Sequence, residues 1–199
     1  SQPDIVNHFF KDSNNFYINM YFYLPAIISC LITILTTPPT IALAKKFGAE
    51  GIGLCRTERQ FNAPERLSVI REYILAENSA QRNEALEKLR LMQREDFTAL
   101  FKELQGMPII IRLLDLPLHE FLPDEAEVKD QATRKRIQEL KEINPMLGHR
   151  GVRLGITNPA IYQMQIEAIN EARAEVPANV SIMIPQVITL QELLWVKKY

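Results

Sequence analysis

The stretch GAEGIGLCRTERQF, residues 48–61, decides the fold class of this chain. Its centre, GIGLC, is a compact apolar run bounded by glycines, which is typical of a β-strand buried on both faces. Arg56 follows this run directly, and Thr57 and Glu58 come next. A charge at the end of a buried strand indicates either a structural ion pair or a ligand-binding group.

Two more strands are predicted further along the chain. PIIIRLLD, residues 108–115, begins with β-branched residues and again ends in charge, at Arg112 and Asp115. VSIMIPQV, residues 180–187, is the third. Amphipathic spacing and terminal signals, with Ser79 and Thr189 as expected N-caps, predict helices over residues 37–48, 63–78, 79–106, 131–143, 158–176 and 190–199.

This alternation of strand and helix predicts an α/β fold with a parallel sheet, either open or closed into a barrel. We expect one domain over residues 37–199, with a long loop at residues 116–130. A complete (β/α)8 barrel usually needs about 250 residues, so a chain of 199 residues leaves a partial barrel possible.

Composition excludes several classes of protein. The net charge of −1 gives no electrostatic case for nucleic acid or an anionic membrane. Cys30 and Cys55 form neither a disulfide framework nor a metal-ligand spacing, which predicts a reducing, cytoplasmic setting.

Residues 1–36 form an atypical N-terminal segment, rich in aromatic residues and almost uncharged. Its run FYINMYFYLPAIISCLITIL, residues 16–35, has the length of a membrane-spanning helix, although Asn19 and Pro25 interrupt it and no Lys/Arg cluster flanks it. Three interpretations stay open: a membrane span, a buried strand and helix, or a non-native extension.

Arg56 and Arg112 are the strongest candidates for a binding site. Both stand where a strand ends, and ligands of parallel α/β proteins bind at that edge of the sheet. Guanidinium groups suit phosphate and carboxylate because they donate paired hydrogen bonds and keep their charge when desolvated. Spacing alone leaves a structural ion pair open for each arginine. Asp115 could orient Arg112, join the outer shell of a metal, or form a simple salt bridge.

Four motifs together resemble the pyruvate, phosphate dikinase family of phosphoenolpyruvate-utilising enzymes. They occur in family order and at family-like spacing, and the similarity covers the chain from about residue 37. The motifs are FGAEGIGLCRTE (47–58), IIIRLLDLPLHEFLP (109–123), NPMLGHRGVRLGI (144–156) and SIMIPQV (181–187). The turn LLDLPLHEFLP distinguishes this pattern from Enzyme I-type phosphotransferases and phosphoenolpyruvate synthases, which remain the alternative enzyme families.

The resemblance implies a (β/α)8 barrel that binds phosphoenolpyruvate or pyruvate with Mg²⁺, and exchanges a phosphoryl group with a phosphohistidine on a separate domain. It implies that Arg56 and Arg112 grip the phosphoryl group, with Arg150 as a third member and Asp115 beside them. In the family, the metal-binding glutamate, an Asn-Asp pair and the catalytic cysteine lie on later strands. We therefore expect a barrel truncated after about half its length, without metal ligands or a catalytic acid, and inactive alone.

Activity would then need the remaining half-barrel and the phosphohistidine domain on another chain. An alternative from a different class is a non-catalytic product, either the remnant of a disrupted gene or a membrane-attached module. An open half-barrel would also expose strand edges and apolar faces, so we expect self-association.

Overall fold

The structure is a computed structural model that describes residues 38–115, 117–123, 125, 128–141, 144 and 147–198. The expectations for residues 1–36, including the candidate span at 16–35, fall outside these residues. No helix within the described ranges is both long and apolar enough to cross a membrane.

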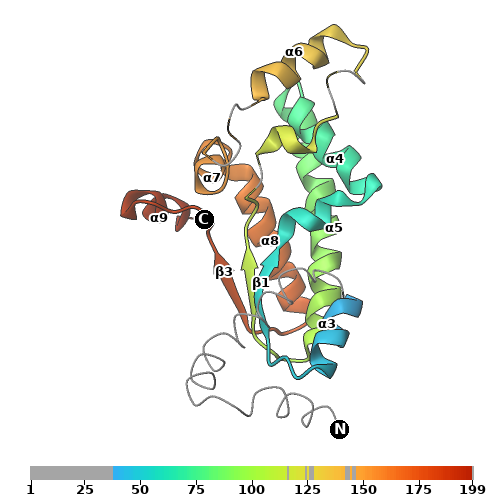
Figure 1. Cartoon of the computed structure of the whole chain (residues 1–199), viewed down its shortest axis with the longest axis vertical. Helices are drawn as coiled ribbons and strands as arrows, with labels where there is room; N and C mark the ends of the chain where they lie inside the picture. The colour runs from blue at the N-terminus through green and yellow to red at the C-terminus, as the bar shows by residue number, and fades with distance from the viewer. Residues whose placement is uncertain are drawn as a thin grey trace, which may run out of the picture.

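Three parallel strands form the sheet, in the order β1-β2-β3 (Figure 1). They are β1 (Ile52–Arg56), β2 (Ile109–Arg112) and β3 (Val180–Met183). The register places Arg56 opposite Arg112, and Arg112 opposite Met183. The predicted α/β fold with parallel strands is therefore confirmed, and the three-stranded sheet is consistent with part of a barrel.

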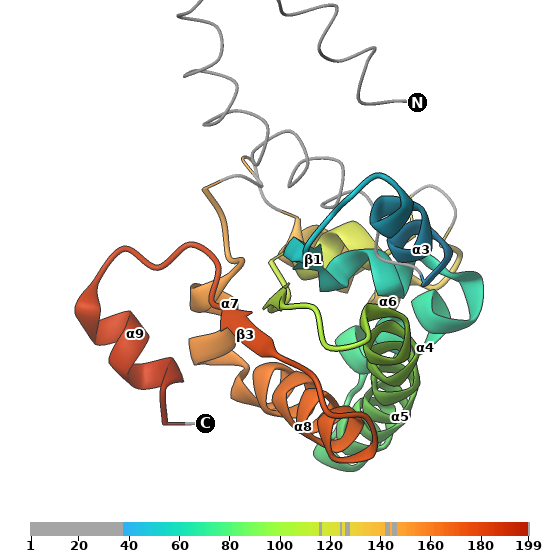
Figure 2. The ribbon, with the colours of Figure 1, turned by 90° about the horizontal axis from the view of Figure 1, so that it is seen from below.

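Helices connect the strands and cover one side of the sheet. Figure 2 shows α5 and α8 side by side on that side, where they pack against each other. The helices are α3 (Pro38–Lys46), α4 (Pro64–Leu75), α5 (Ser79–Leu104), α6 (Gln131–Leu140), α7 (Val152–Thr157), α8 (Pro159–Glu175) and α9 (Leu190–Val196), with 3-10 helices η1 (Thr57–Asn62) and η2 (Leu118–Phe121).

The core lies between the sheet and the α5–α8 pair. Ile109 and Ile111 of β2 are buried together with residues of both helices, including Phe97, Leu104 and Ala168. Alternation along a strand sends neighbouring side chains to opposite faces. Arg112 therefore projects from the face of β2 opposite to Ile111, away from the core.

Several local predictions were wrong. Asn78, rather than Ser79, caps α5, because its side chain accepts a hydrogen bond from the Gln81 N–H at 2.9 Å. The third strand ends at Met183 instead of continuing to Val187, since the chain turns through Pro185 and Gln186.

The burial of β1 also differs from expectation. Gly53 and Leu54 of β1 are only partly buried, so this strand is not covered on both faces. A short helix, α7, lies within the motif NPMLGHRGVRLGI, for which no secondary structure was predicted. The predicted N-cap of α9 is confirmed, because Thr189 and Glu192 form a reciprocal capping box.

Candidate anion-binding site

Arg56 and Arg112 are neighbours at the carboxyl ends of two adjacent parallel strands. Residues paired directly across a sheet point to the same face, so both side chains leave the sheet on the side opposite to the buried Cys55 and Ile111. The sequence predicted each arginine separately at a strand end. Only the register shows that the two are adjacent.

A chain of alternating charges extends from Arg112. Its Nη2 contacts the Glu58 carboxylate, and its Nη1 lies 3.1 Å from Asp115 Oδ2. The same Asp115 oxygen lies 3.0 Å from Arg150 Nη2, and Arg150 Nε donates to the Asp115 carbonyl at 2.9 Å. These contacts form one connected network of Glu58, Arg112, Asp115 and Arg150. We call these four residues and the neighbouring Arg56 the arginine cluster.

Arg56 differs from the other arginines of the cluster. Within the described ranges no carboxylate pairs with it, and its Nε is buried without a hydrogen-bond partner. Among the described residues, the cluster thus contains three arginines and two carboxylates, Glu58 and Asp115. An uncompensated guanidinium that is partly buried is suited to an anionic ligand.

Helix α8 fixes the backbone that carries Asp115. Tyr162 donates its hydroxyl to the Leu114 carbonyl at 3.1 Å, and Gln165 Oε1 accepts from the Leu114 N–H at 2.9 Å. Burial, followed by the charge of Asp115, raises the pKa of Tyr162 far above its ordinary value. The phenol therefore stays protonated and keeps donating. Both side chains are fully buried, so this anchor is shielded from water.

Gly151 allows the Arg150 loop to approach this anchor closely. Its φ is 58°, and a Cβ built there would lie 3.0 Å from the Pro185 carbonyl and 3.1 Å from Asp115 Oδ1. A larger residue would push the loop away from Asp115. Arg153, by contrast, donates to the Leu147 carbonyl and to Gln186, so it takes part in a separate contact.

The structure brings together the predicted residues Arg112, Asp115 and Arg150, and places Arg56 beside Arg112. Sequence reasoning missed the role of Glu58, although it lies two residues after Arg56. It also missed the two polar residues of α8, because helical spacing assigns Tyr162 and Gln165 only to the core-facing side.

The cluster does not fit a metal ion. Among the described residues, no group of three or more His, Cys, Asp or Glu side chains could hold one. Glu58 and Asp115, the acidic residues of the cluster, are already paired with guanidinium groups.

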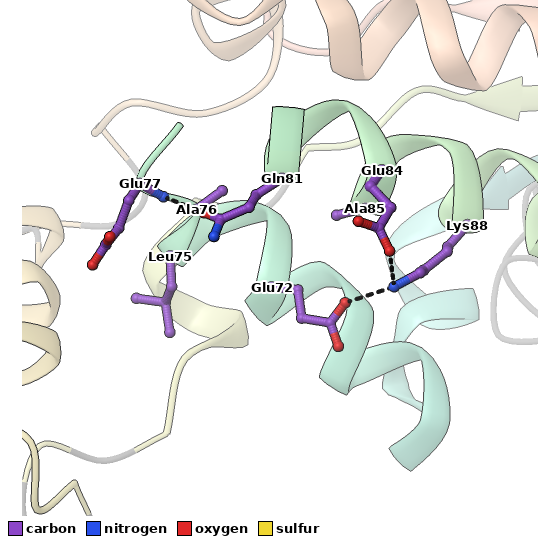
Figure 3. A pocket seen from close by; sticks show the side chains of 8 residues that line it. All are labelled: Glu72, Leu75, Ala76, Glu77, Gln81, Glu84, Ala85 and Lys88. Carbon is purple, nitrogen blue, oxygen red and sulfur yellow. Dashed lines mark hydrogen bonds and ion pairs between the residues drawn. The ribbon is translucent and has the colours of Figure 1, made fainter. Parts of the chain in front are cut away.

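A groove of about 430 Å³ lies elsewhere, between the end of α4 and the start of α5 (Figure 3). Its acidic residues are Glu72, Glu77 and Glu84. Lys88 is paired with two of them, at 3.4 Å from Glu72 and 3.0 Å from Glu84. This acidic lining would repel a phosphate, so the arginine cluster is the better candidate for an anion.

Residues 28–199 match the family described as PEP-utilising enzyme, PEP-binding domain. The chain belongs to this family. The resemblance seen in the four motifs is thereby confirmed. Arg56 and Arg112 both lie within the matched residues, and the matched domain is named for binding phosphoenolpyruvate.

Relatives from distant organisms support the same family. The chain is 50% identical over 177 residues to a pyruvate, phosphate dikinase of Rhizobium meliloti, which covers 81% of this chain and 20% of that protein. It is 44% identical over 183 residues to the enzyme of Entamoeba histolytica (81% and 21%). It is also 44% identical over 174 residues to pyruvate, phosphate dikinase 1, chloroplastic, of Arabidopsis thaliana (79% and 18%). The chain thus spans about one fifth of the length of these relatives.

Proposed function

We propose that this chain supplies the phosphoryl-gripping part of a phosphoenolpyruvate or pyruvate site in a pyruvate, phosphate dikinase-like enzyme. The observation that carries this proposal is the pairing of Arg56 and Arg112 at adjacent strand ends, where no carboxylate of the described residues pairs with Arg56. The names of the family and of the relatives supply the substrate class.

The chemistry of phosphoryl transfer suits this arrangement. Negative charge is spread over the oxygens of the transferring group, and catalysis depends largely on positioning and neutralising them. Arg56 offers the excess positive charge, while Arg112 is already oriented by Glu58 and Asp115. Arg150 acts on Asp115, because it donates hydrogen bonds to both the carbonyl and the carboxylate of that residue.

The proposal assigns the remaining chemistry to other parts of the enzyme. In it, Mg²⁺ binds through ligands outside the described residues, and the phosphohistidine and proton donor also lie outside. The described strands then form one part of a (β/α)8 barrel, and strands from outside the described residues complete it. In this proposal the chain alone binds the anion without turning it over, because the metal ligands and the proton donor that an enolate needs lie outside the described residues.

Calorimetric titration of the purified chain with phosphoenolpyruvate, with and without Mg²⁺, tests the proposal. We expect saturable binding that Arg112→Ala abolishes. Arg59→Ala is the matched control, because it removes an exposed positive charge from η1, close to the cluster in sequence, and should leave binding unchanged. Circular dichroism shows whether the wild-type chain is folded. If the folded wild-type chain does not bind phosphoenolpyruvate, the proposal is contradicted.

A further inference from the structure

Glu58 is a buried carboxylate that the family resemblance did not assign to the site. It is only 6% exposed, and it lies in η1, directly after β1. One of its oxygens contacts Nη2 of Arg112, on the neighbouring strand. We infer that Glu58 is a positioning residue, which aims the Arg112 guanidinium at the phosphoryl group. This inference rests on the proposed function.

The contacts of Arg112 show why Glu58 can act in this way. Glu58 holds one terminal nitrogen of the guanidinium and Asp115 holds the other. A planar group that is gripped at both ends cannot rotate freely, whereas a single partner would leave it able to swing. Each terminal nitrogen carries two N–H groups, so a second N–H on each remains for a ligand.

The backbone beside this pair is fixed as well. Thr57 donates its hydroxyl to the Arg112 carbonyl at 3.0 Å, which ties the start of η1 to the end of β2. Thr57 is fully buried, so water does not compete for this bond. Glu58 therefore approaches Arg112 from a segment whose own position relative to β2 is set.

The cluster also contains polar atoms that protein groups do not satisfy. Glu58 Oε2, Arg112 Nε and Arg56 Nε are all buried without a hydrogen-bond partner. Buried polar atoms in a purely structural ion-pair network are normally satisfied. Unpaired donors on both strand-end arginines are what an anion-binding cluster shows before its ligand is bound.

A competing role for Glu58 would change the affinity for the ligand in the opposite direction from a positioning role. If Glu58 competed with the ligand for Arg112, its removal would free the guanidinium and strengthen binding. If it positions Arg112, its removal weakens binding, because the ligand must then restrict the side chain itself. The sign of the change therefore decides between the two roles.

The test measures phosphoenolpyruvate binding by calorimetry in Glu58→Gln, which keeps the shape of the side chain and removes its charge. We expect binding to weaken about 10- to 100-fold, as for loss of a charged hydrogen bond. Asp96→Asn is the matched control, because Asp96 pairs with both terminal nitrogens of Arg66 outside the cluster. Unchanged or tighter binding in Glu58→Gln, or an equal loss in Asp96→Asn, would overturn the inference.

A double substitution separates positioning from general structure. In an Arg112→Lys background the planar fork is gone, so Glu58→Gln should cause little further loss if it acts through Arg112. Additive losses would show that Glu58 acts elsewhere. Should Glu58→Gln fail to fold, Glu58→Asp keeps the charge but withdraws it by one methylene, and we expect an intermediate loss of affinity; unchanged affinity would count against positioning.

Nitrogen-15 spectra of the arginine side chains in the ligand-free chain give a readout that does not depend on binding. We expect the Arg112 Nε–H signal to be sharp in the wild type and in Asp96→Asn, and to shift or broaden in Glu58→Gln. If the wild type binds no phosphoenolpyruvate, the proposed function fails, while the spectra still decide whether Glu58 orients Arg112. An Arg112 signal that is the same in all three proteins would overturn the inference.

Discussion

The three arginines of the cluster differ in what neutralises them. Arg112 faces two carboxylates and Arg150 faces one, whereas Arg56 faces none within the described residues. Because a partly buried charge without a partner is costly, the folded chain keeps Arg56 at the expense of its own stability. Such a cost is expected where a residue is retained for a ligand.

Cys55 shows the opposite case, a reactive group made inert by its position. It is 2% exposed, and burial, followed by the charges of Glu58 and Asp96, raises its pKa from 9.0 to about 12. In a Cys30→Ser background, we expect native Cys55 to react very slowly with a thiol reagent at pH 8, and rapidly in denaturant. Fast reaction of the native chain would contradict the burial of this thiol.

The same shift makes stability depend on pH. Between pH 9 and about 12 the unfolded chain loses the thiol proton while the folded chain keeps it. The folded state then binds more protons, so the free energy of unfolding falls as pH rises through this window. Comparison of urea unfolding at several pH values in the wild type and Cys55→Ala should show a shallower decline in the variant.

Several helices and strands each position a different residue of the site. Strands β1 and β2 bring Arg56 and Arg112 together through their register, and α8 holds the Leu114 backbone just before Asp115. Arg150 lies directly before Gly151, the N-cap of α7, and donates to the Asp115 carbonyl. The site therefore depends on contacts between elements that are distant in the sequence.

The start of α5 provides a test of a single element. Asn78 accepts from the Gln81 N–H, whereas Ser79 is the first helical residue and makes no such cap. We expect Asn78→Ala to lower the free energy of unfolding by about 1 kcal/mol, the usual cost of losing an N-cap. Ser79→Ala should change it by only a few tenths. The midpoints of urea unfolding measure both, and equal effects would show that the cap is assigned to the wrong residue.

Viewed as a whole, the molecule carries a large exposed apolar surface at its C-terminal end. Ile188 is 78% exposed and Leu190 is 70% exposed, and other apolar residues of β3 and α9 are exposed with them. Among the described residues, β3 is also an edge strand, because only β2 pairs with it. Figure 1 shows α9 projecting away from the α5–α8 pair. Exposed apolar patches and open strand edges favour association with other protein chains.

We therefore expect the isolated chain to self-associate through this surface. The double variant Ile188→Lys, Leu190→Lys should shift the sedimentation profile toward the monomer without lowering the melting temperature. Leu91→Lys is the matched control, since Leu91 is an exposed leucine on α5, outside this surface. A wild-type chain that sediments as a monomer at all concentrations tested would refute the prediction.

Much of this protein follows from its sequence alone. Apolar runs such as GIGLC and PIIIR predict the first two strands, since burial demands apolar side chains, and their terminal charges mark Arg56 and Arg112. The four motifs also identify the family. These features are local, so a short stretch of sequence is sufficient to reveal them. The cap of α5 and the length of β3 were less predictable, because several adjacent residues could serve as the boundary.

Only the tertiary structure decided how the charged residues are connected. Register places Arg56 beside Arg112, and packing of α8 brings Tyr162 and Gln165 to Leu114, 48 and 51 residues away along the chain. The role of Glu58 likewise depends on Arg112, 54 residues further on. Side chains meet across such separations because strands pair and helices pack on them, and no local pattern in the sequence encodes which partner each charge will find.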